Sequence, residues 1–132
     1  PEAVRDVAQA LFDMGCYEVS LGDTIGAGTP ESVATMLETV LPRLPADRLA
    51  GHFHDTRDNA LDNVAAALRL GLRVFDSAVG GLGGCPYAPG AKGNLATGPL
   101  VALLEQSGFS TGIDREALAK AEQYLRSITA SA

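Results

Sequence analysis

Apolar residues recur along this chain at two spacings, one typical of helices and one typical of strands. Apolar positions three or four residues apart predict helices that include residues 4–11, 30–41, 61–68, 97–104 and 118–128. Shorter apolar segments predict strands at residues 17–21, 49–54 and 72–79. Helices and strands alternate as far as residue 79, which is the order of βαβ units that build a parallel sheet.

Residues with strong capping preferences mark the ends of these predicted helices. Thr29 followed by Pro30 is typical of a helix start, and Asp114 is expected to cap the last helix. Gly15 stands where a glycine in the left-handed conformation would end the first helix. Residues 80–94, after the third strand, are rich in glycine and predict a long loop.

Three strands are too few to close a barrel, and as an open sheet they would leave two bare edges. Residues 1–132 are therefore expected to form either a sheet whose edges are covered by partners or part of a barrel whose other half is missing from this chain. The first residues already read as a helix, which agrees with a chain that begins within a fold. An exposed apolar interior face and unpaired edges would favour association with another copy or with the other half of the barrel.

The composition argues against several classes of partner and location. A net charge of −6 disfavours nucleic acid and anionic membranes as partners. Two cysteines do not make a disulfide framework. No apolar run is long enough to cross a membrane, and no signal peptide is visible.

His52 and His54 are the first candidate functional residues. Side chains alternate along a strand, so both imidazole rings are expected on the same face of the sheet. Asn94 and Asp55 add oxygen donors, and a mixture of imidazole and oxygen ligands suits Mg²⁺ or Mn²⁺ better than structural zinc. Buried histidines that bond to the backbone are common, so the pair alone leaves that simpler interpretation open.

Further candidates lie at or just beyond strand ends, where parallel α/β folds place their sites. Cys85 stands among glycines that can bury little, which predicts an exposed thiol on a mobile loop that carries a proton. Asp23 is either a turn residue or a carboxylate that faces the site. Asp76 is a candidate partner for a metal ligand, whereas Cys16 is expected to pack in the core.

Four segments together carry a specific resemblance to a known family. Residues 78–88 read Ala-Val-Gly-Gly-Leu-Gly-Gly-Cys-Pro-Tyr-Ala, and residues 93–97 read Gly-Asn-Leu-Ala-Thr. Residues 52–56 read His-Phe-His-Asp-Thr, and residues 14–26 contain Met-Gly-Cys-Tyr-Glu and Leu-Gly-Asp-Thr-Ile-Gly. These segments resemble the 3-hydroxy-3-methylglutaryl-CoA lyase family, whose signature around the catalytic cysteine is close to residues 78–88. The resemblance covers nearly the whole chain.

The resemblance implies the C-terminal part of a (β/α)₈ TIM barrel, with about three parallel strands and flanking helices. It implies divalent-metal-dependent cleavage of hydroxymethylglutaryl-CoA to acetyl-CoA and acetoacetate, a reaction of leucine degradation and ketone body formation. His52, His54 and Asn94 would be the ligands of the Mg²⁺ or Mn²⁺ ion. Cys85, His52 and Asp23 would be the catalytic residues, and Cys85 would protonate the acetyl-CoA enolate.

The family also has functional residues that this chain lacks. They are an adjacent arginine and aspartate on the first strand and a glutamate on the second. One metal ligand and the enolate-stabilising arginine would then lie outside this chain, which alone is expected to be inactive. Two other functions stay open. The chain could belong to a related aldolase or Claisen-type synthase, which would also use the histidine pair, or be an inactive half-barrel that serves as a binding or assembly module.

The same resemblance sets expectations for partners and location. The substrate would be an acyl-CoA, with neither nucleic acid nor a membrane as a partner. We expect a homo-oligomer, such as a dimer, or association with the missing half of the barrel. The location would be the cytoplasm, as in bacteria, and the mitochondrial matrix stays open because the N-terminal half of the barrel is missing.

Overall fold

The computed structural model describes residues 1–84 and 93–129. In this part, helices and strands alternate in the predicted order, with short 3₁₀ turns before the second strand and after the third. The strands are β1 (Val19–Asp23), β2 (Leu49–Phe53) and β3 (Val74–Asp76). The helices are α1 (Glu2–Asp13), α2 (Pro30–Val40), α3 (Ala60–Arg69), α4 (Thr97–Gln106) and α5 (Arg115–Thr129), and the turns are η1 (Ala46–Arg48) and η2 (Val79–Gly81). None of the helices in this described part is long and apolar enough to cross a membrane.

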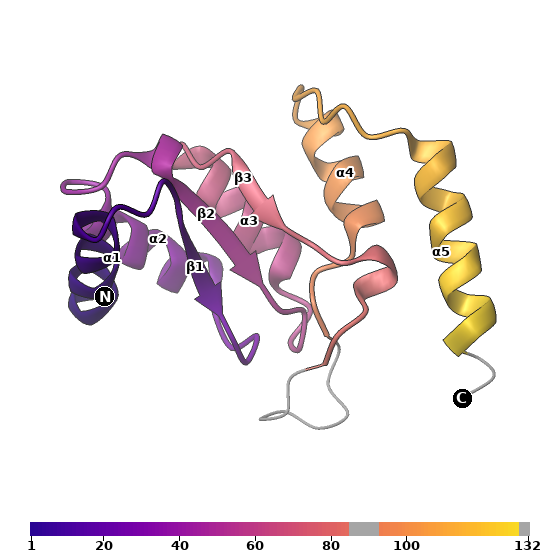
Figure 1. Ribbon diagram of the computed structural model, residues 1–132, viewed down its shortest axis with the longest axis horizontal. Coiled ribbons are helices and arrows are strands. Elements are labelled where there is room, and N and C mark those ends of the chain that lie inside the picture. Colours follow the sequence, from indigo (N-terminus) through magenta and orange to yellow (C-terminus); the bar gives the residue numbers. More distant parts are fainter. Residues whose placement is uncertain (85–92, 130–132) are drawn as a thin grey trace.

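The three strands form one parallel sheet in the order β1-β2-β3, as the alternation predicts (Figure 1). β2 is the central strand, and its Ala50 lies opposite Ser20 of β1. Two residues further along β2, His52 lies opposite Gly22 of β1 and Asp76 of β3. Because all three strands run in the same direction, their C-terminal ends meet at one edge of the sheet.

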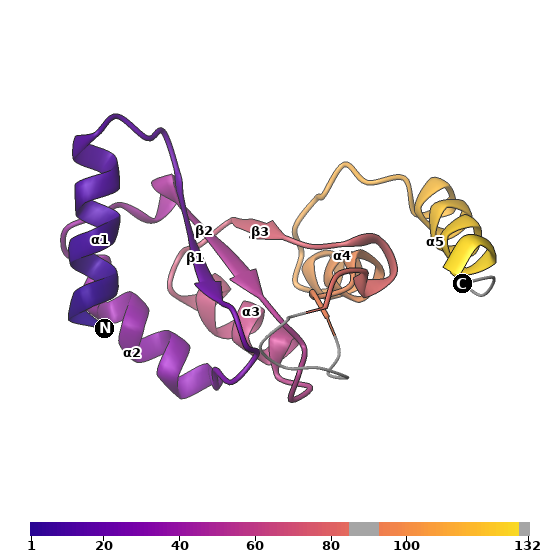
Figure 2. The ribbon, with the colours of Figure 1, turned by 60° about the horizontal axis from the view of Figure 1, so that its bottom comes forward.

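Helices cover one face of this sheet. Helices α1, α2, α3 and α4 follow one another round one side of the strands, and α5 lies beyond α4 (Figure 2). The face that meets them is apolar, and together with the helices' apolar stripes it forms the core. Its buried members include Val19, Leu21, Leu37, Leu49, Phe53, Val64 and Leu72. Burial on this side fixes which side chains point to the opposite face.

The opposite face of the sheet carries mainly small and polar side chains. Its residues are Ser20, Gly22, Ala50, His52, Val74 and Asp76. The expectation of an exposed apolar interior face is therefore wrong. Side chains alternate along β1 and β2, so the apolar residues point to the helices and the polar ones remain on the open face.

The first strand begins later than the expected segment 17–21. Gly15 ends α1 with a φ of 100°, as predicted. The guanidinium of Arg48 then donates hydrogen bonds to the backbone carbonyls of Cys16 and Tyr17. These bonds hold residue 17 outside the sheet, and Tyr17 is 81% exposed. The strand therefore begins at Val19.

The third strand is shorter than the expected segment 72–79. The N–H of Leu72 donates to the carbonyl of Ala67 (3.1 Å), so this residue belongs to the turn that follows α3 and not to the strand. At the other end, the pairing of β3 with β2 stops at Asp76, and Ala78 instead forms a parallel bridge with Ala96. The chain thus returns to the C-terminal end of β3 immediately before α4.

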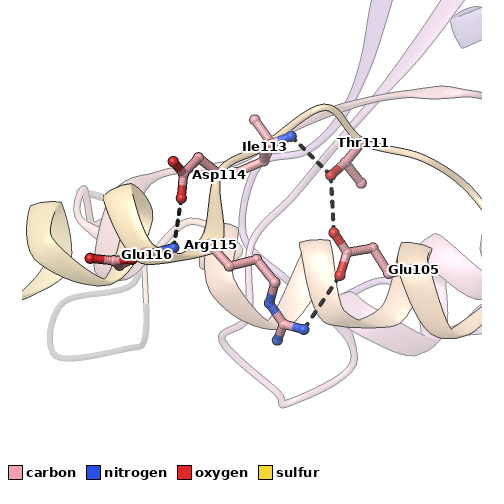
Figure 3. A network of polar contacts seen from close by, with 6 residues as sticks. All are labelled: Glu105, Thr111, Ile113, Asp114, Arg115 and Glu116. Carbon is pink, nitrogen blue, oxygen red and sulfur yellow. Dashed lines mark hydrogen bonds and ion pairs between the residues drawn. The ribbon is translucent and has the colours of Figure 1, made fainter.

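Polar contacts hold the connection between α4 and α5, as Figure 3 shows. Asp114 caps α5 as predicted, because its carboxylate accepts the N–H groups of Glu116 (2.9 Å) and Ala117 (3.0 Å). The Arg115 guanidinium lies 3.4 Å from the Glu105 carboxylate near the end of α4. These contacts fix the start of α5 beside the end of α4.

The capping box at the start of α2 should contribute measurably to stability. The Thr29 hydroxyl accepts the Ser32 N–H (3.3 Å), and the Ser32 hydroxyl accepts the Thr29 N–H (2.9 Å). Thr29→Ala should lower the free energy of unfolding by about 1 kcal/mol. Urea denaturation measures the change, with Thr35→Ala on the exposed side of α2 as a control that should stay within about 0.5 kcal/mol. A Thr29→Ala chain as stable as its control would contradict the capping role.

Candidate metal centre

His52 and His54 lie at the C-terminal end of β2, on the open face of the sheet. His52 is the fourth residue of the strand, and His54 directly follows Phe53, the last residue of the strand. The ring centroids are 5.3 Å apart, which agrees with the expectation that both rings share one face. The side chain of His52 is 37% exposed, whereas His54 is only 8% exposed. One ring therefore remains open to solvent, and the other is enclosed by the fold.

Asn94 lies beside His54, although α3, β3 and η2 separate the two residues in the sequence. They form an antiparallel bridge, and backbone hydrogen bonds of 3.0 Å flank it on both sides. The amide nitrogen of Asn94 donates to the carbonyl of Leu82 (3.1 Å). This bond orients the amide and leaves its oxygen, Oδ1, to face another partner. The structure thus brings together the three side chains that were predicted as metal ligands.

Two buried polar atoms of this group have no hydrogen-bond partner within the described residues. They are Nδ1 of His54 and Oδ1 of Asn94. A buried polar atom without a partner costs about 1–3 kcal/mol. Both an imidazole nitrogen and an amide oxygen offer lone pairs to a cation, and this donor set suits a divalent ion. The residues present therefore fit the metal that the resemblance implies.

Asp76 and Ser20 support His52 from the neighbouring strands. Oδ2 of Asp76 lies 3.5 Å from Nδ1 of His52, so the expectation that Asp76 is close to a candidate ligand is confirmed. The Ser20 hydroxyl donates to the same Asp76 oxygen (2.7 Å). A carboxylate beside Nδ1 leaves the other ring nitrogen, Nε2, for coordination. Sequence reasoning missed Ser20, because a single serine on a strand has no distinguishing signal.

Asp23, the last residue of β1, takes the turn role that was one of its two interpretations. Its two carboxylate oxygens accept the N–H groups of Ala27 (3.1 Å) and Gly28 (2.9 Å). The Gly28 carbonyl in turn accepts the side-chain amides of Asn59 (3.3 Å) and Asn63 (3.2 Å). These bonds tie the loop after β1 to α3 and the residue that precedes it. A catalytic role for Asp23 stays a prediction.

Two other polar candidates have local structural roles. The Asp55 carboxylate accepts the N–H of Ala60 (3.1 Å), the first residue of α3. Its oxygen is therefore engaged at the start of this helix. Cys16 is a free cysteine that packs against the core, as expected.

Cys85 lies outside the described residues, so its role as a proton-carrying thiol stays a prediction. On either side of this segment, the backbones at Gly83 and Gly93 pass very close to each other, and we call these two residues the glycine neck. A Cβ added to Gly93 would lie 2.1 Å from the carbonyl oxygen of Gly83, which itself has a φ of 104°. The N–H of Asn94 donates to this same carbonyl (2.9 Å). Glycine is needed at residue 93 because the two backbone segments pass too closely for a side chain.

The candidate ligands by themselves do not complete a metal site. Within residues 1–84 and 93–129, no three His, Cys, Asp or Glu side chains gather closely enough to hold a metal ion. The candidate set contains two imidazoles and one neutral amide, whereas Mg²⁺ takes about six ligands in octahedral geometry. Water, substrate or a carboxylate from another segment must supply the remaining positions.

Parallel strands with polar side chains at their C-terminal ends define part of an α/β barrel with its site at that end. The HMGL-like family model matches residues 1–125, and the chain belongs to this family. The hydroxymethylglutaryl-CoA lyase of Pseudomonas mevalonii is 58% identical to it over 120 residues. That match covers 91% of this chain and 40% of the Pseudomonas protein.

Solved structures agree with the sequence comparison. The HMG-CoA lyase of Brucella melitensis has a TM-score of 0.93 at 56% identity, over 96% of this chain and 44% of its own. An HMG-CoA lyase of Acinetobacter baumannii in complex with coenzyme A and 3-methylmalate has a TM-score of 0.84 at 40% identity, over 92% and 40% of the two chains. The chain thus spans less than half the length of these relatives. Its fold is part of a TIM barrel, three parallel strands with flanking helices, which confirms the predicted fold class.

The glycine neck makes a prediction about the bridge that carries Asn94. Gly93→Ala places a methyl group against the Gly83 carbonyl and should weaken the bridge. Hydrogen exchange of the Asp55 and Leu95 amides, whose hydrogen bonds flank the bridge, measures this as a loss of protection. Gly84→Ala is the matched control, because nothing lies within 4 Å of an added Cβ there. Equal protection in the two variants would argue against this account of the neck.

Proposed function

We propose that this chain is the part of a hydroxymethylglutaryl-CoA lyase that supplies three ligands for a divalent cation. The reaction is the cleavage of 3-hydroxy-3-methylglutaryl-CoA to acetyl-CoA and acetoacetate. The observation that carries the proposal is the pair of unpartnered atoms, Nδ1 of His54 and Oδ1 of Asn94, beside a second imidazole. The 58% identity to the Pseudomonas mevalonii lyase supports the same chemistry.

We assign Mg²⁺ or Mn²⁺ to the candidate metal centre, held by His52, His54 and Asn94. When bound, the cation supplies Lewis-acid polarisation of the substrate's hydroxyl and carboxylate oxygens. Imidazole mixed with amide oxygen favours a hard or borderline ion, whereas structural zinc more often recruits thiolates. Asp76 and Ser20 keep the His52 ring beside β3.

The proposed cleavage needs two proton transfers. A base removes the proton of the tertiary hydroxyl, the oxygen forms the ketone of acetoacetate, and the adjacent carbon–carbon bond breaks. Its electron pair goes to the acetyl-CoA enolate, and the Cys85 thiol then donates a proton to the enolate carbon. His52 lies on the open face where this substrate would bind. For Asp23, the bonds to Ala27 and Gly28 favour a role in holding the loop after β1 over contact with the reacting atoms.

The proposed partners follow from the same assignment. The substrate is an acyl-CoA, in line with the coenzyme A bound to the Acinetobacter baumannii lyase. Another copy of this chain, or the other half of a barrel, would cover the outer edge of β1. A groove between α1 and β1 beside that edge supports this, and its apolar residues include Val4, Val7, Leu11, Val19 and Leu21. We propose a cytoplasmic location, as in bacteria.

A second candidate function is a binding or assembly module without catalysis. One observation favours it: among the described residues, no three His, Cys, Asp or Glu side chains gather closely enough to hold a metal ion. A related aldolase or Claisen-type synthase could use the same histidine pair, but the relatives at 56–58% identity are lyases. Assays for metal-dependent cleavage separate these functions, and the 132 residues alone should be inactive.

Metal-dependent cleavage and its loss in His54→Ala test the main proposal together. The intact protein with Mn²⁺ should release acetoacetate from hydroxymethylglutaryl-CoA, and His54→Ala should lose both this activity and Mn²⁺ binding measured by electron paramagnetic resonance. Asp47→Ala is the control, because Asp47 is exposed in η1, before the opposite end of β2. Unchanged Mn²⁺ affinity in His54→Ala would refute the ligand assignment. An intact wild-type protein that releases no acetoacetate would refute the lyase.

Replacement of the loop thiol tests the proposed proton donor. Cys85→Ser should lower turnover by about 10²–10⁴-fold, because a hydroxyl is a far poorer acid than a thiol. Cys16→Ser is the matched control, because Cys16 packs against the core and should affect stability rather than turnover. Steady-state kinetics with thermal melting of both variants measures the two effects. Near-normal turnover in Cys85→Ser would rule out the role.

A further inference from the structure

A line of polar side chains crosses all three strands of the open face. The Ser20 hydroxyl on β1 donates to Oδ2 of Asp76 on β3 (2.7 Å), and this oxygen lies 3.5 Å from Nδ1 of His52 on β2. Residues 20 and 76 come from the two outer strands, so their hydrogen bond passes over the central strand. This contact is long-range in the sequence and joins the three strands on the face that carries the candidate metal centre.

The register of the sheet explains why these side chains meet. His52 lies directly opposite Asp76, and on its other side it lies opposite Gly22, which has no side chain to support the ring. Ser20 precedes Gly22 by two residues on β1 and lies opposite Ala50 of β2. The hydrogen bond therefore runs diagonally between residues 50 and 52 of the central strand.

The small side chain of Ala50 makes this crossing feasible. Ala50 belongs to the open face, two residues before His52, yet it is only 1% exposed. A larger side chain at this position would stand between the Ser20 hydroxyl and the Asp76 carboxylate. The sequence of β2 thus leaves space for a contact between its two neighbours.

We propose that Ser20 and Asp76 are positioning residues for His52. The Asp76 carboxylate, 3.5 Å from Nδ1, favours the neutral imidazole whose proton is on that nitrogen, and Ser20 holds the carboxylate in place from the far strand. The ring is then fixed in the tautomer whose Nε2 carries the free lone pair. This inference rests on the proposed function only in its last step, in which that lone pair coordinates the divalent cation.

The two histidines are held in place by different interactions. His54 is enclosed, and its Nδ1 has no partner within the described residues. His52 is half exposed, and a ring in that position has the freedom to rotate away unless a neighbour holds it. The fold orients His54 by burial and by its bridge to Asn94, whereas His52 depends on polar contacts across the sheet.

The tautomer of His52 is the direct test. In the intact protein without metal, ¹⁵N NMR of the neutral imidazole should show the Nδ1–H tautomer in the wild type and a mixture in Asp76→Ala. Ser20→Ala should shift the mixture in the same direction by a smaller amount. Ser20→Thr, which keeps the hydroxyl, should restore the wild-type signal. Asp47→Asn, in η1, is the control and should leave it unchanged.

Mn²⁺ affinity tests the last step separately. Asp76→Ala should weaken binding by about 10–100-fold, as is typical for partners of metal-ligating histidines. A wild-type tautomer and wild-type affinity in Asp76→Ala would overturn the inference. Lost affinity with an unchanged tautomer would also overturn it, since Asp76 would then be a ligand itself. A wild-type protein that binds no Mn²⁺ would refute the proposed metal centre. If Asp76→Ala changed the tautomer but not the Mn²⁺ affinity, the role of Asp76 in positioning the ring would stand and its link to metal binding would be refuted.

Discussion

The pairing of β2 at its C-terminal end is the constraint on which the candidate metal centre depends. Within the sheet, the parallel register sets His52 beside Asp76. Just past the strand, the bridge to Asn94 holds the second imidazole next to an amide oxygen. Neither neighbour is close in sequence. The three candidate ligands therefore come together only when the segment before α4 docks on β2, and His52 gains its supporting carboxylate only when β3 pairs with β2.

The apolar face of the sheet makes this arrangement one-sided. Helices α1 to α4 bury the alternate residues of the strands, and a shift of one residue in register would send the histidines into the core. Hydrophobic packing therefore specifies the orientation of the polar residues without touching them. The glycine neck adds a second constraint, because the backbone at residue 93 passes so close to residue 83 that no side chain fits between them.

Local patterns in the sequence predicted the features that depend on neighbouring residues. The order of elements, the caps at Thr29 and Asp114, and the shared face of His52 and His54 all follow from spacing and side-chain chemistry. The start of β1 did not follow, because Arg48 binds backbone carbonyls that would otherwise extend this strand. The role of Ser20 could not be predicted from the sequence either, since its partner Asp76 lies on a strand that does not pair with β1.

The central claim is that His52, His54 and Asn94 surround one divalent cation. Crystals of the intact protein grown with Mn²⁺, with diffraction recorded near the manganese absorption edge, locate the ion directly by its anomalous signal. The account predicts one strong peak at the C-terminal end of β2, within coordination distance of an imidazole nitrogen of each histidine and of Oδ1 of Asn94. A peak elsewhere, or none beside these side chains at saturating Mn²⁺, would contradict it.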